Sequence, residues 1–243
     1  MEKEPSVAVI TCTIGRGHLD QTLKSIEDQT HKNIQHYILT DAAMTEGDFA
    51  ALRDKHKADN RHWVYWPTTV GGPGWECRRL WSMLAPVINE DAVCFLNDDD
   101  WYEPVHIEAL LTALKHGFDW AHSFRKIYDE QGNYLFDDIC ESLGEAHPVW
   151  NVPWENFAEQ NSVMMTTHCY RAIAPYFALP GWGNDRLTYK MLKRLYPRVA
   201  ACAEHTMCFR LGGSPYSVSK DYFVQGNAWM RQKYGDNLPW LKK

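Results

Sequence analysis

The sequence lacks the features of a membrane protein and those of a small secreted protein. No run of apolar residues approaches the roughly 18 that a membrane-spanning helix needs, and the opening residues MEKEPSVAVITCT do not form a signal peptide. The seven cysteines are odd in number and contain no C-x-x-C pair, a pattern that favours reduced thiols over a disulfide framework. We therefore predict a cytoplasmic protein, and any contact with a membrane would be peripheral.

Motifs of nucleic-acid, dinucleotide and zinc proteins are also missing. The net charge of −6 argues against non-specific nucleic-acid binding as the main role, although a local basic groove remains open. Gly15-Arg16-Gly17 follows an apolar run but lacks the third glycine of a dinucleotide-binding fingerprint. None of the eleven histidines pairs with another at metal-ligand spacing on an obvious helix. With no internal repeat and no linker, residues 1–243 are expected to form a single domain.

The first half of the chain alternates between short β-branched runs and helical patterns. Leu19, Leu23 and Ile26 share one face of a predicted helix. Residues 75–89 also have helical spacing, and Pro86 should kink or end that helix. Four runs have the composition of buried strands, namely 6–13, 35–40, 62–66 and 92–96. This alternation predicts an α/β fold with a mostly parallel central sheet, in which ligands bind beyond the carboxyl ends of the strands.

The second half has a different pattern. A helix should begin at Pro104 and end at Gly117. Residues 120–136 are expected to form a hairpin, and residues 162–167 another strand. Residues 185–195 predict a further helix, in which three apolar side chains share one face, Leu187, Met191 and Leu195. The strands and helices of this half therefore do not follow a simple alternation.

Three adjacent carboxylates, Asp98, Asp99 and Asp100, come directly after the fourth predicted strand. Buried negative charges at a strand end are costly unless a cation neutralises them. Carboxylate oxygens suit Mg²⁺ or Mn²⁺, which usually share their ligands with substrate phosphates. The alternative is a solvated acidic loop, or a helix N-terminus stabilised by aspartate. The apolar strand before the triplet, and the aromatic pair and proline after it, favour the metal site.

The order and spacing of these motifs resemble the family 2 glycosyltransferases of the GT-A fold. SVAVITCTIGRGHLDQTLKSIEDQT resembles the opening strand, turn and helix of that family, and FLNDDDWYEP resembles its metal-binding segment. The likeness extends from Val7 to about Ser219. It implies a GT-A type nucleotide-diphospho-sugar transferase fold, with a mostly parallel sheet flanked by helices and a mixed second half. Residues 1–101 would then bind the nucleotide sugar and residues 102–243 the acceptor.

The resemblance also implies roles for residues at the strand ends. Asp99 and Asp100 are expected to bind the metal ion, Mn²⁺ or Mg²⁺, with Asp98 in a supporting position. Asn97 stands where the family has an acidic residue, and an amide is a poorer metal ligand, although it can hydrogen-bond a ribose hydroxyl. Asp41 is expected near the nucleobase. The full set of expected donor-binding residues is Thr11, Thr13, Asp41, Arg78, Arg79, Asn97, Asp98, Arg210 and Ser214.

Later segments match the family motifs that carry catalysis and acceptor binding. PGWGNDRLTYKML resembles the segment whose aspartate is the catalytic base, and Asp185 matches that aspartate. The alternative for Asp185 is a helix N-terminal carboxylate, and for Arg78 and Arg79 a surface position on a helix. In CFRLGGSPYSVS, the arginine and the first serine are expected to close over the donor diphosphate. Trp182 and Trp101 are expected to line the acceptor site, because flat aromatic rings suit sugars.

The resemblance thus implies a metal-dependent glycosyltransferase that moves a sugar from a nucleotide diphosphate sugar, with a UDP-sugar favoured, to an acceptor hydroxyl with inversion. A non-catalytic nucleotide-sugar or glycan binding protein is the first alternative, because of Asn97. A sugar-1-phosphate nucleotidyltransferase is the second, although ITCTIGRGHL does not match the Gly-rich first loop of that class. The sequence leaves the acceptor open between a glycan, a protein and a modified nucleic acid.

Overall fold

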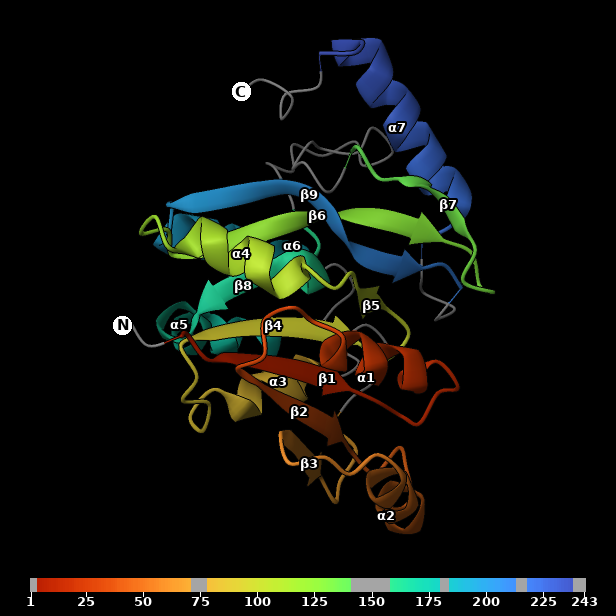
Figure 1. Cartoon of the computed structure of the whole chain (residues 1–243), viewed down its shortest axis with the longest axis vertical. Helices are drawn as coiled ribbons and strands as arrows, with labels where there is room; N and C mark the ends of the chain where they lie inside the picture. Colours follow the sequence, from red (N-terminus) through yellow and green to blue (C-terminus); the bar gives the residue numbers. More distant parts are fainter. Residues whose placement is uncertain (1–3, 71–77, 141–157, 180–183, 213–217, 238–243) are drawn as a thin grey trace.

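The computed structural model describes residues 4–70, 78–140, 158–179, 184–212 and 218–237. Its strands are β1 (Val7–Cys12), β2 (Ile34–Thr40), β3 (Arg61–Tyr65), β4 (Ala92–Asn97), β5 (Trp101–Tyr102), β6 (Trp120–Tyr128), β7 (Tyr134–Asp137), β8 (Val163–Thr166) and β9 (Val199–Arg210). Its helices are α1 (Leu19–Glu27), α2 (Glu46–Lys55), α3 (Arg78–Leu84), α4 (His106–Leu114), α5 (Thr167–Phe177), α6 (Asn184–Leu195) and α7 (Lys220–Tyr234), with a 3-10 turn at Gln160–Ser162. The strands form one nine-stranded sheet in the order β3-β2-β1-β4-β8-β6-β9-β5, and β7 pairs with β6 (Figure 1).

β1 lies at the centre of the parallel part of this sheet. It pairs in parallel with β2 on one side and β4 on the other, and all of its residues are buried. Ala8 and Ile10 belong to one hydrophobic cluster, whereas Val7 and Val9 belong to a second one, because alternate side chains of a strand point to opposite faces. A strand that is covered on both faces needs a nearly continuous apolar run, which explains the sequence VAVITC.

Helices cover both faces of the sheet (Figure 1). α1 and α4 lie on one face, where Ile26 and Leu110 join the hydrophobic cluster. α3, α5 and α6 lie on the other, where Leu84, Ile173 and Leu192 are buried. This arrangement leaves the carboxyl ends of β1, β2 and β4 along one edge, where Thr13, Asp41 and the acidic triplet follow them in the chain.

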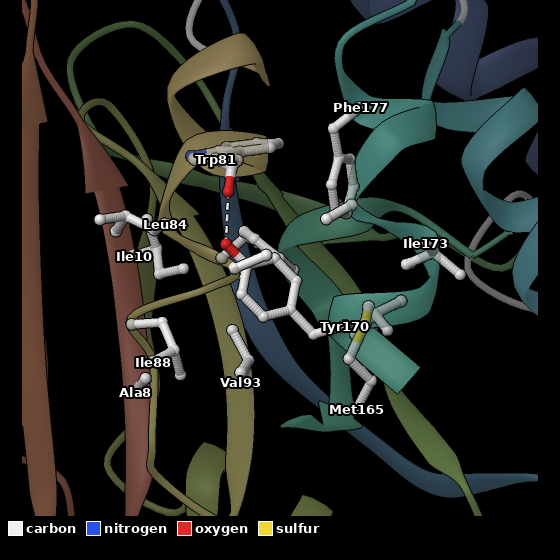
Figure 2. Close-up of a cluster of buried hydrophobic side chains, with 14 of the residues drawn as sticks. Ala8, Ile10, Trp81, Leu84, Ile88, Val93, Met165, Tyr170, Ile173 and Phe177 are labelled. Atoms are coloured by element: carbon white, nitrogen blue, oxygen red, sulfur yellow. Dashed lines mark hydrogen bonds between the residues drawn. The ribbon is translucent and has the colours of Figure 1, made fainter. Parts of the chain in front are cut away.

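The cluster between the sheet, α3 and α5 is rich in aromatic rings. Figure 2 shows Trp81, Tyr170 and Phe177 in this cluster, with the Tyr170 hydroxyl donating a hydrogen bond to the main-chain carbonyl of Trp81. The ring of Phe95 lies 4.9 Å from that of Trp81 and 5.2 Å from that of Phe177. Burying each such side chain contributes about 1.5–3 kcal/mol. The cluster therefore holds α3 and α5 firmly against β4, the strand that ends in the acidic triplet.

β8 joins the parallel part of the sheet to the second half. It pairs antiparallel with β4 and with β6, and β6 continues in parallel with β9. β5, which begins directly after the triplet, pairs antiparallel with β9 so that Trp101 lies opposite Cys208. This register brings Arg210, two residues further along β9, next to the triplet. The sheet therefore runs without a break through both halves of the chain.

α7 packs against the β6–β7 hairpin and β9. Phe223 is buried in a cluster with Ile127, and the ring of Phe209 lies 5.7 Å from that of Phe223. The Asn227 side chain donates a hydrogen bond of 2.8 Å to the main-chain carbonyl of Asp137. These contacts fix the helix by its first three turns.

The structure confirms the predicted strands of the first half to within about two residues, and it shows elements that the sequence patterns did not indicate. α2, α5, α7 and most of β9 were not predicted. Leu187 and Leu195, expected to share the apolar face of α6, are 37% and 48% exposed, whereas Thr188 and Leu192 are buried. The face of α6 that packs against the core therefore contains Thr188 and Leu192 and lies next to the predicted face. Within the described residues, none of the helices combines the length and the apolar character needed to cross a bilayer.

Candidate functional site

The adjacent ends of β1 and β4 bring two polar residues together. Cys12 lies opposite Asn97 in the parallel register, so the residues that follow, Thr13 and Asp98, leave the sheet side by side. The Thr13 hydroxyl donates a hydrogen bond of 2.8 Å to Oδ2 of Asp98. The expected donor-site residues Thr13 and Asp98 are thus in direct contact.

Arg16 supplies positive charge to the acidic triplet. Its Nη1 lies 2.8 Å from Oδ2 of Asp99 and 3.5 Å from Oδ1 of Asp98. Asp98 and Asp99 are only 5% and 8% exposed, so their charges need compensation. Burial raises the pKa of Asp98 to about 6, and the Arg16 guanidinium opposes this rise. We refer to Thr13, Arg16 and Asp98–Asp100 as the acidic-triplet site.

Asp100 is held differently from its two neighbours. Its Oδ2 accepts a hydrogen bond of 2.8 Å from the Asn161 side chain, and its Oδ1 accepts one of 2.9 Å from the main-chain N–H of Arg210. Burial, together with the charge of Asp99, holds the pKa of Asp100 well above its usual range. Both carboxylate oxygens are therefore engaged inside the protein. These two bonds fix the orientation of the Asp100 carboxylate relative to Asn161 and β9, and its role as a metal ligand stays a prediction.

The Arg210 guanidinium, expected to close over the diphosphate, is tied to three parts of the chain. Nε donates to the main-chain carbonyl of Asp99 (3.1 Å), Nη1 donates to that of Glu130 (3.0 Å), and Nη2 donates to the Gln21 side chain. Its Cζ also lies 4.9 Å from the centre of the Trp101 ring, and Arg210 is only 4% exposed. Arg210 thus fastens the loop carrying the triplet to β9, α1 and the β6–β7 turn.

Thr11 and Asp41, two further residues expected at the donor site, also have partners within the protein. Thr11 is fully buried, and its hydroxyl lies 2.9 Å from the ring of His36. Asp41, at the end of β2, accepts hydrogen bonds from the main-chain N–H groups of Ala43 (2.9 Å) and Val70 (2.8 Å). Asp41 therefore shapes the edge of the sheet near the end of β2, whereas Thr11 lies in the core behind that edge.

A second group of charged residues lies beside the 3-10 turn at 160–162. Burial raises the pKa of Glu159 to about 7; the nearby charges of Arg125 and Arg78 oppose this rise, and that of Asp185 reinforces it. Asp185 is half-buried in the first turn of α6, and its Oδ1 accepts a hydrogen bond of 2.9 Å from the N–H of Arg186. We call Arg78, Glu159 and Asp185 the Glu159 cluster.

Two contacts characterise this cluster, one at Arg78 and one at Asn161. Nη1 of Arg78 is buried and has no hydrogen-bond partner among the described residues. Its N–H groups are therefore available to bind an anion. The main-chain N–H of Asn161 donates a hydrogen bond of 2.7 Å to Oε2 of Glu159, while its side chain donates to Asp100. Asn161 therefore links the Glu159 cluster directly to the acidic-triplet site.

The remaining predicted site residues are placed as follows. Asn97 is half-buried as the last residue of β4, and Arg79 is half-buried in the first turn of α3. Trp101 is half-buried with its ring centre 4.4 Å from that of Tyr128. Trp182 and Ser214 lie outside the described residues.

Sequence patterns did not reveal Arg16, Glu159 or Asn161 as site residues. Arg16 has a usable signal, because it is a lone cation placed directly after the first strand and hence at the edge where the acidic triplet lies. Glu159 and Asn161 have no comparable signal. They become site residues only because β8, which follows them, inserts between β4 and β6.

The acidic-triplet site offers part of a divalent-metal site. Asp98 and Asp99 supply the carboxylate oxygens that Mg²⁺ and Mn²⁺ prefer, and such ions often bind through one or two carboxylates plus substrate phosphates. Across the part of the chain that the structure describes, no group of three or more His, Cys, Asp or Glu side chains could hold a metal ion. Asp98 and Asp99 alone would leave such an ion to complete its ligands with phosphate and water.

Comparisons with known proteins support the fold. No protein-family model matches the chain, and a search of curated proteins gives no match. Among solved structures, residues 1–349 of S. aureus TarS match with a TM-score of 0.61 at 13% identity, covering 84% of this chain and 60% of that one. The TarS 1–349 complex with UDP matches with a TM-score of 0.59 at 12% identity, covering 90% of this chain and 62% of that one. The corresponding complex with UDP-GlcNAc gives a TM-score of 0.60 at 13% identity, with 90% and 64% covered.

This chain spans about 60% of the length of the TarS structure that it matches. At such low identity the likeness shows the fold. The chain has the α/β architecture predicted from its sequence, a central mixed sheet of the GT-A type flanked by helices.

Proposed function

We propose that this chain is a glycosyltransferase of the family 2 type, which moves a sugar from a UDP-sugar to an acceptor hydroxyl with inversion. The observation that carries the proposal is the position of Asp98 and Asp99 at the carboxyl end of β4, beside Thr13 at the end of β1. Ligands of open α/β sheets bind at this edge. The TarS structures with this fold include complexes with UDP and UDP-GlcNAc, which supports a nucleotide sugar as the donor.

The acidic-triplet site would hold the diphosphate of the donor together with Mn²⁺ or Mg²⁺. We propose Asp99 as the main metal ligand with Asp98 in support, because both carboxylates lie at the strand edge. Asp100 would position the other two through its bonds to Asn161 and the N–H of Arg210. A bound divalent cation would supply positive charge to the departing diphosphate.

The Glu159 cluster would hold the acceptor and take its proton. The acceptor oxygen forms a bond to the anomeric carbon while the bond from that carbon to the diphosphate breaks, and the hydroxyl proton passes to Asp185 as general base. A single in-line displacement of this kind inverts the anomeric centre. The buried Nη1 of Arg78, which has no hydrogen-bond partner among the described residues, would face the anionic donor.

A second candidate function is nucleotide-sugar binding without catalysis. Two observations favour it: an amide, Asn97, stands at the end of β4 where the family has a carboxylate, and the single charge of Arg16 already pairs with Asp98 and Asp99. A protein of this kind would bind the donor but would not release UDP from it.

A screen of nucleotide sugars by thermal shift, with and without Mn²⁺, tests both candidates. A ligand that binds only the folded protein raises its stability by RT ln(1 + [L]/Kd), about 2.7 kcal/mol at a hundredfold excess over Kd. We expect UDP-sugars to stabilise the chain in the presence of Mn²⁺, with smaller effects from GDP- and ADP-sugars. No stabilisation by any nucleotide sugar would contradict both candidate functions.

A further inference from the structure

Arg16 is held at the acidic-triplet site by its backbone. Gly15 has φ +80°, and a Cβ at this position would meet Cε of Met44 at 2.8 Å, so the turn needs glycine. The N–H of Gly15 donates to the Thr13 hydroxyl (2.9 Å), and the Arg16 carbonyl accepts from the N–H of Leu19 (3.2 Å). The turn between β1 and α1 therefore presents the Arg16 side chain to the triplet from a fixed position.

Nη1 of Arg16 contacts both Asp98 and Asp99, as a cation bound between these two carboxylates would. A single nitrogen, Nη1, approaches carboxylate oxygens of both Asp99 (2.8 Å) and Asp98 (3.5 Å). A Mg²⁺ ion bound by the same two oxygens would lie about 2.1 Å from each of them. The ion and Nη1 would then be in contact with each other, and two positive charges at that separation repel strongly. The guanidinium and a bridging metal ion exclude each other.

The Arg16 side chain is also able to move away from the two aspartates. It is 31% exposed, whereas the side chains of Asp98 and Asp99 are 6% and 11% exposed. The arginine side chain has four rotatable bonds, so its charge can move to solvent while its backbone stays in the turn. The aspartates have no such freedom, because the loop that carries them is fastened by Arg210 and Asn161.

From this geometry we infer that Arg16 is the resident cation of the acidic-triplet site and that a divalent metal ion must displace it to bind Asp98 and Asp99. Arg16 thereby sets the metal affinity of the site. The inference deepens the proposed function and rests on its metal site.

Mn²⁺ titrations followed by the electron paramagnetic resonance signal of the free ion test this competition. Arg16→Gln should bind Mn²⁺ at least roughly tenfold more tightly than the unchanged protein, because a competing charge at contact distance has been removed. Arg53→Gln is the matched control, since Arg53 pairs with Asp54 on the surface of α2. It should leave the affinity unchanged. Adding Asp99→Asn to Arg16→Gln should abolish the gain.

Arg16→Gln with the same Mn²⁺ affinity as the unchanged protein, or a weaker one, would overturn the inference. The absence of Mn²⁺ binding in every variant would overturn the inference as well. It would also mean that the proposed function does not use this metal. A double-mutant cycle of Arg16→Gln and Asp99→Asn in EDTA adds a readout that needs no metal. Favourable coupling in the unfolding free energy is expected there, and zero coupling would contradict the ion pair. UDP release from a UDP-sugar, measured both with Mn²⁺ and in EDTA, separates these failures from a failure of the transferase assignment, because release under either condition keeps that assignment.

Discussion

The acidic-triplet site and the Glu159 cluster both hold carboxylates in largely enclosed positions, yet the protein compensates their charges to different degrees. At the triplet, Asp98 has Thr13 and Arg16, Asp99 has Arg16, and Asp100 has two hydrogen-bond donors of its own. Glu159 accepts one hydrogen bond from a main-chain N–H while a second carboxylate, that of Asp185, lies nearby. Burial is the main cause that raises the pKa of Glu159 to about 7; the charge of Asp185 reinforces it, and the charges of Arg125 and Arg78 oppose it.

This difference separates two kinds of chemistry. Asp98 and Asp99 lie beside the Arg16 cation, and carboxylates in such a position are suited to holding a metal ion or exchanging one cation for another. Glu159 and Asp185 are two nearby carboxylates with like charges, and such a pair is suited to taking up a proton. We therefore expect changes in the two groups to affect different measurements, even though Asn161 joins them.

Asp185→Asn should give the largest effect. It keeps the size and most hydrogen bonding of Asp185 but cannot take a proton, so turnover should fall by roughly 10²–10⁴-fold while donor affinity stays unchanged. The measurement is the rate of sugar transfer, or of donor hydrolysis, beside a UDP titration. If Asp185 only stabilised the start of α6, asparagine would replace it well and activity would survive. In that event Glu159, which lies near Asp185, is the next candidate base.

Arg210→Ala separates a structural role from a diphosphate-binding role. Arg210 is almost fully buried with its guanidinium bonded to three segments, so its removal should cost about 3–5 kcal/mol of unfolding free energy. Urea unfolding measures this loss. A variant of normal stability with weakened UDP binding would show instead that Arg210 contacts the donor and that its internal bonds are weak.

Asp99→Ala should act on ligand binding with little effect on the fold. Its partner Arg16 is 31% exposed, and partly exposed ion pairs contribute about 1 kcal/mol or less. Metal-dependent UDP binding should be lost, while the midpoint of urea unfolding in EDTA stays near that of the unchanged protein. Undiminished binding of UDP with Mn²⁺ would remove Asp99 from the metal site. Asp28→Ala is the matched control, because Asp28 pairs with Lys24 on the surface of α1.

Glu159→Gln should give the smallest effect, and one that depends on pH. The folded-state pKa of Glu159 is raised from 4.5 to about 7, so the folded protein holds this proton more tightly than the unfolded chain does. Its contribution to stability is therefore fully present below about pH 4.5 and is lost as the pH rises through about 7. Glutamine keeps the acceptor for the Asn161 N–H without the charge.

Glu159→Gln should thus match the unchanged protein near pH 4.5 and exceed it by on the order of 1 kcal/mol at pH 8. Unfolding by urea across this pH range measures the difference. Glu204→Gln, at an exposed position on β9, should show no such pH dependence. A constant difference between the proteins at all pH values would argue against a raised pKa at Glu159.

The centre of the parallel part of the fold could be predicted from the sequence because β1 and β4 are covered on both faces. Such strands need continuous apolar runs, and these runs fix the strand ends to within about two residues. The position of the acidic triplet followed from the same signal, since it comes directly after β4. β1 and β4 pair in register, and this pairing brings Thr13 to Asp98.

Other features depend on tertiary contacts that no local pattern encodes. The direction of the Arg16 side chain follows from the left-handed turn at Gly15, not from charge spacing. The buried face of α6 was predicted wrongly because its apolar side chains Leu187 and Leu195 lie on the exposed side, while Thr188 fills a core position. Burial of Glu159 and its approach to Asp185 likewise depend on how β8 and α6 pack.

The most direct test of the proposed function is the release of UDP from UDP-sugars, followed over time with Mn²⁺ present. UDP-GlcNAc is the first donor to use, because it is the sugar nucleotide seen in a structure of this fold. We predict measurable UDP release by the unchanged protein that Asp185→Asn slows by roughly 10²–10⁴-fold. Donor binding without any UDP release, from UDP-GlcNAc or another UDP-sugar and with a range of acceptors, would contradict the transferase assignment and favour a binding protein.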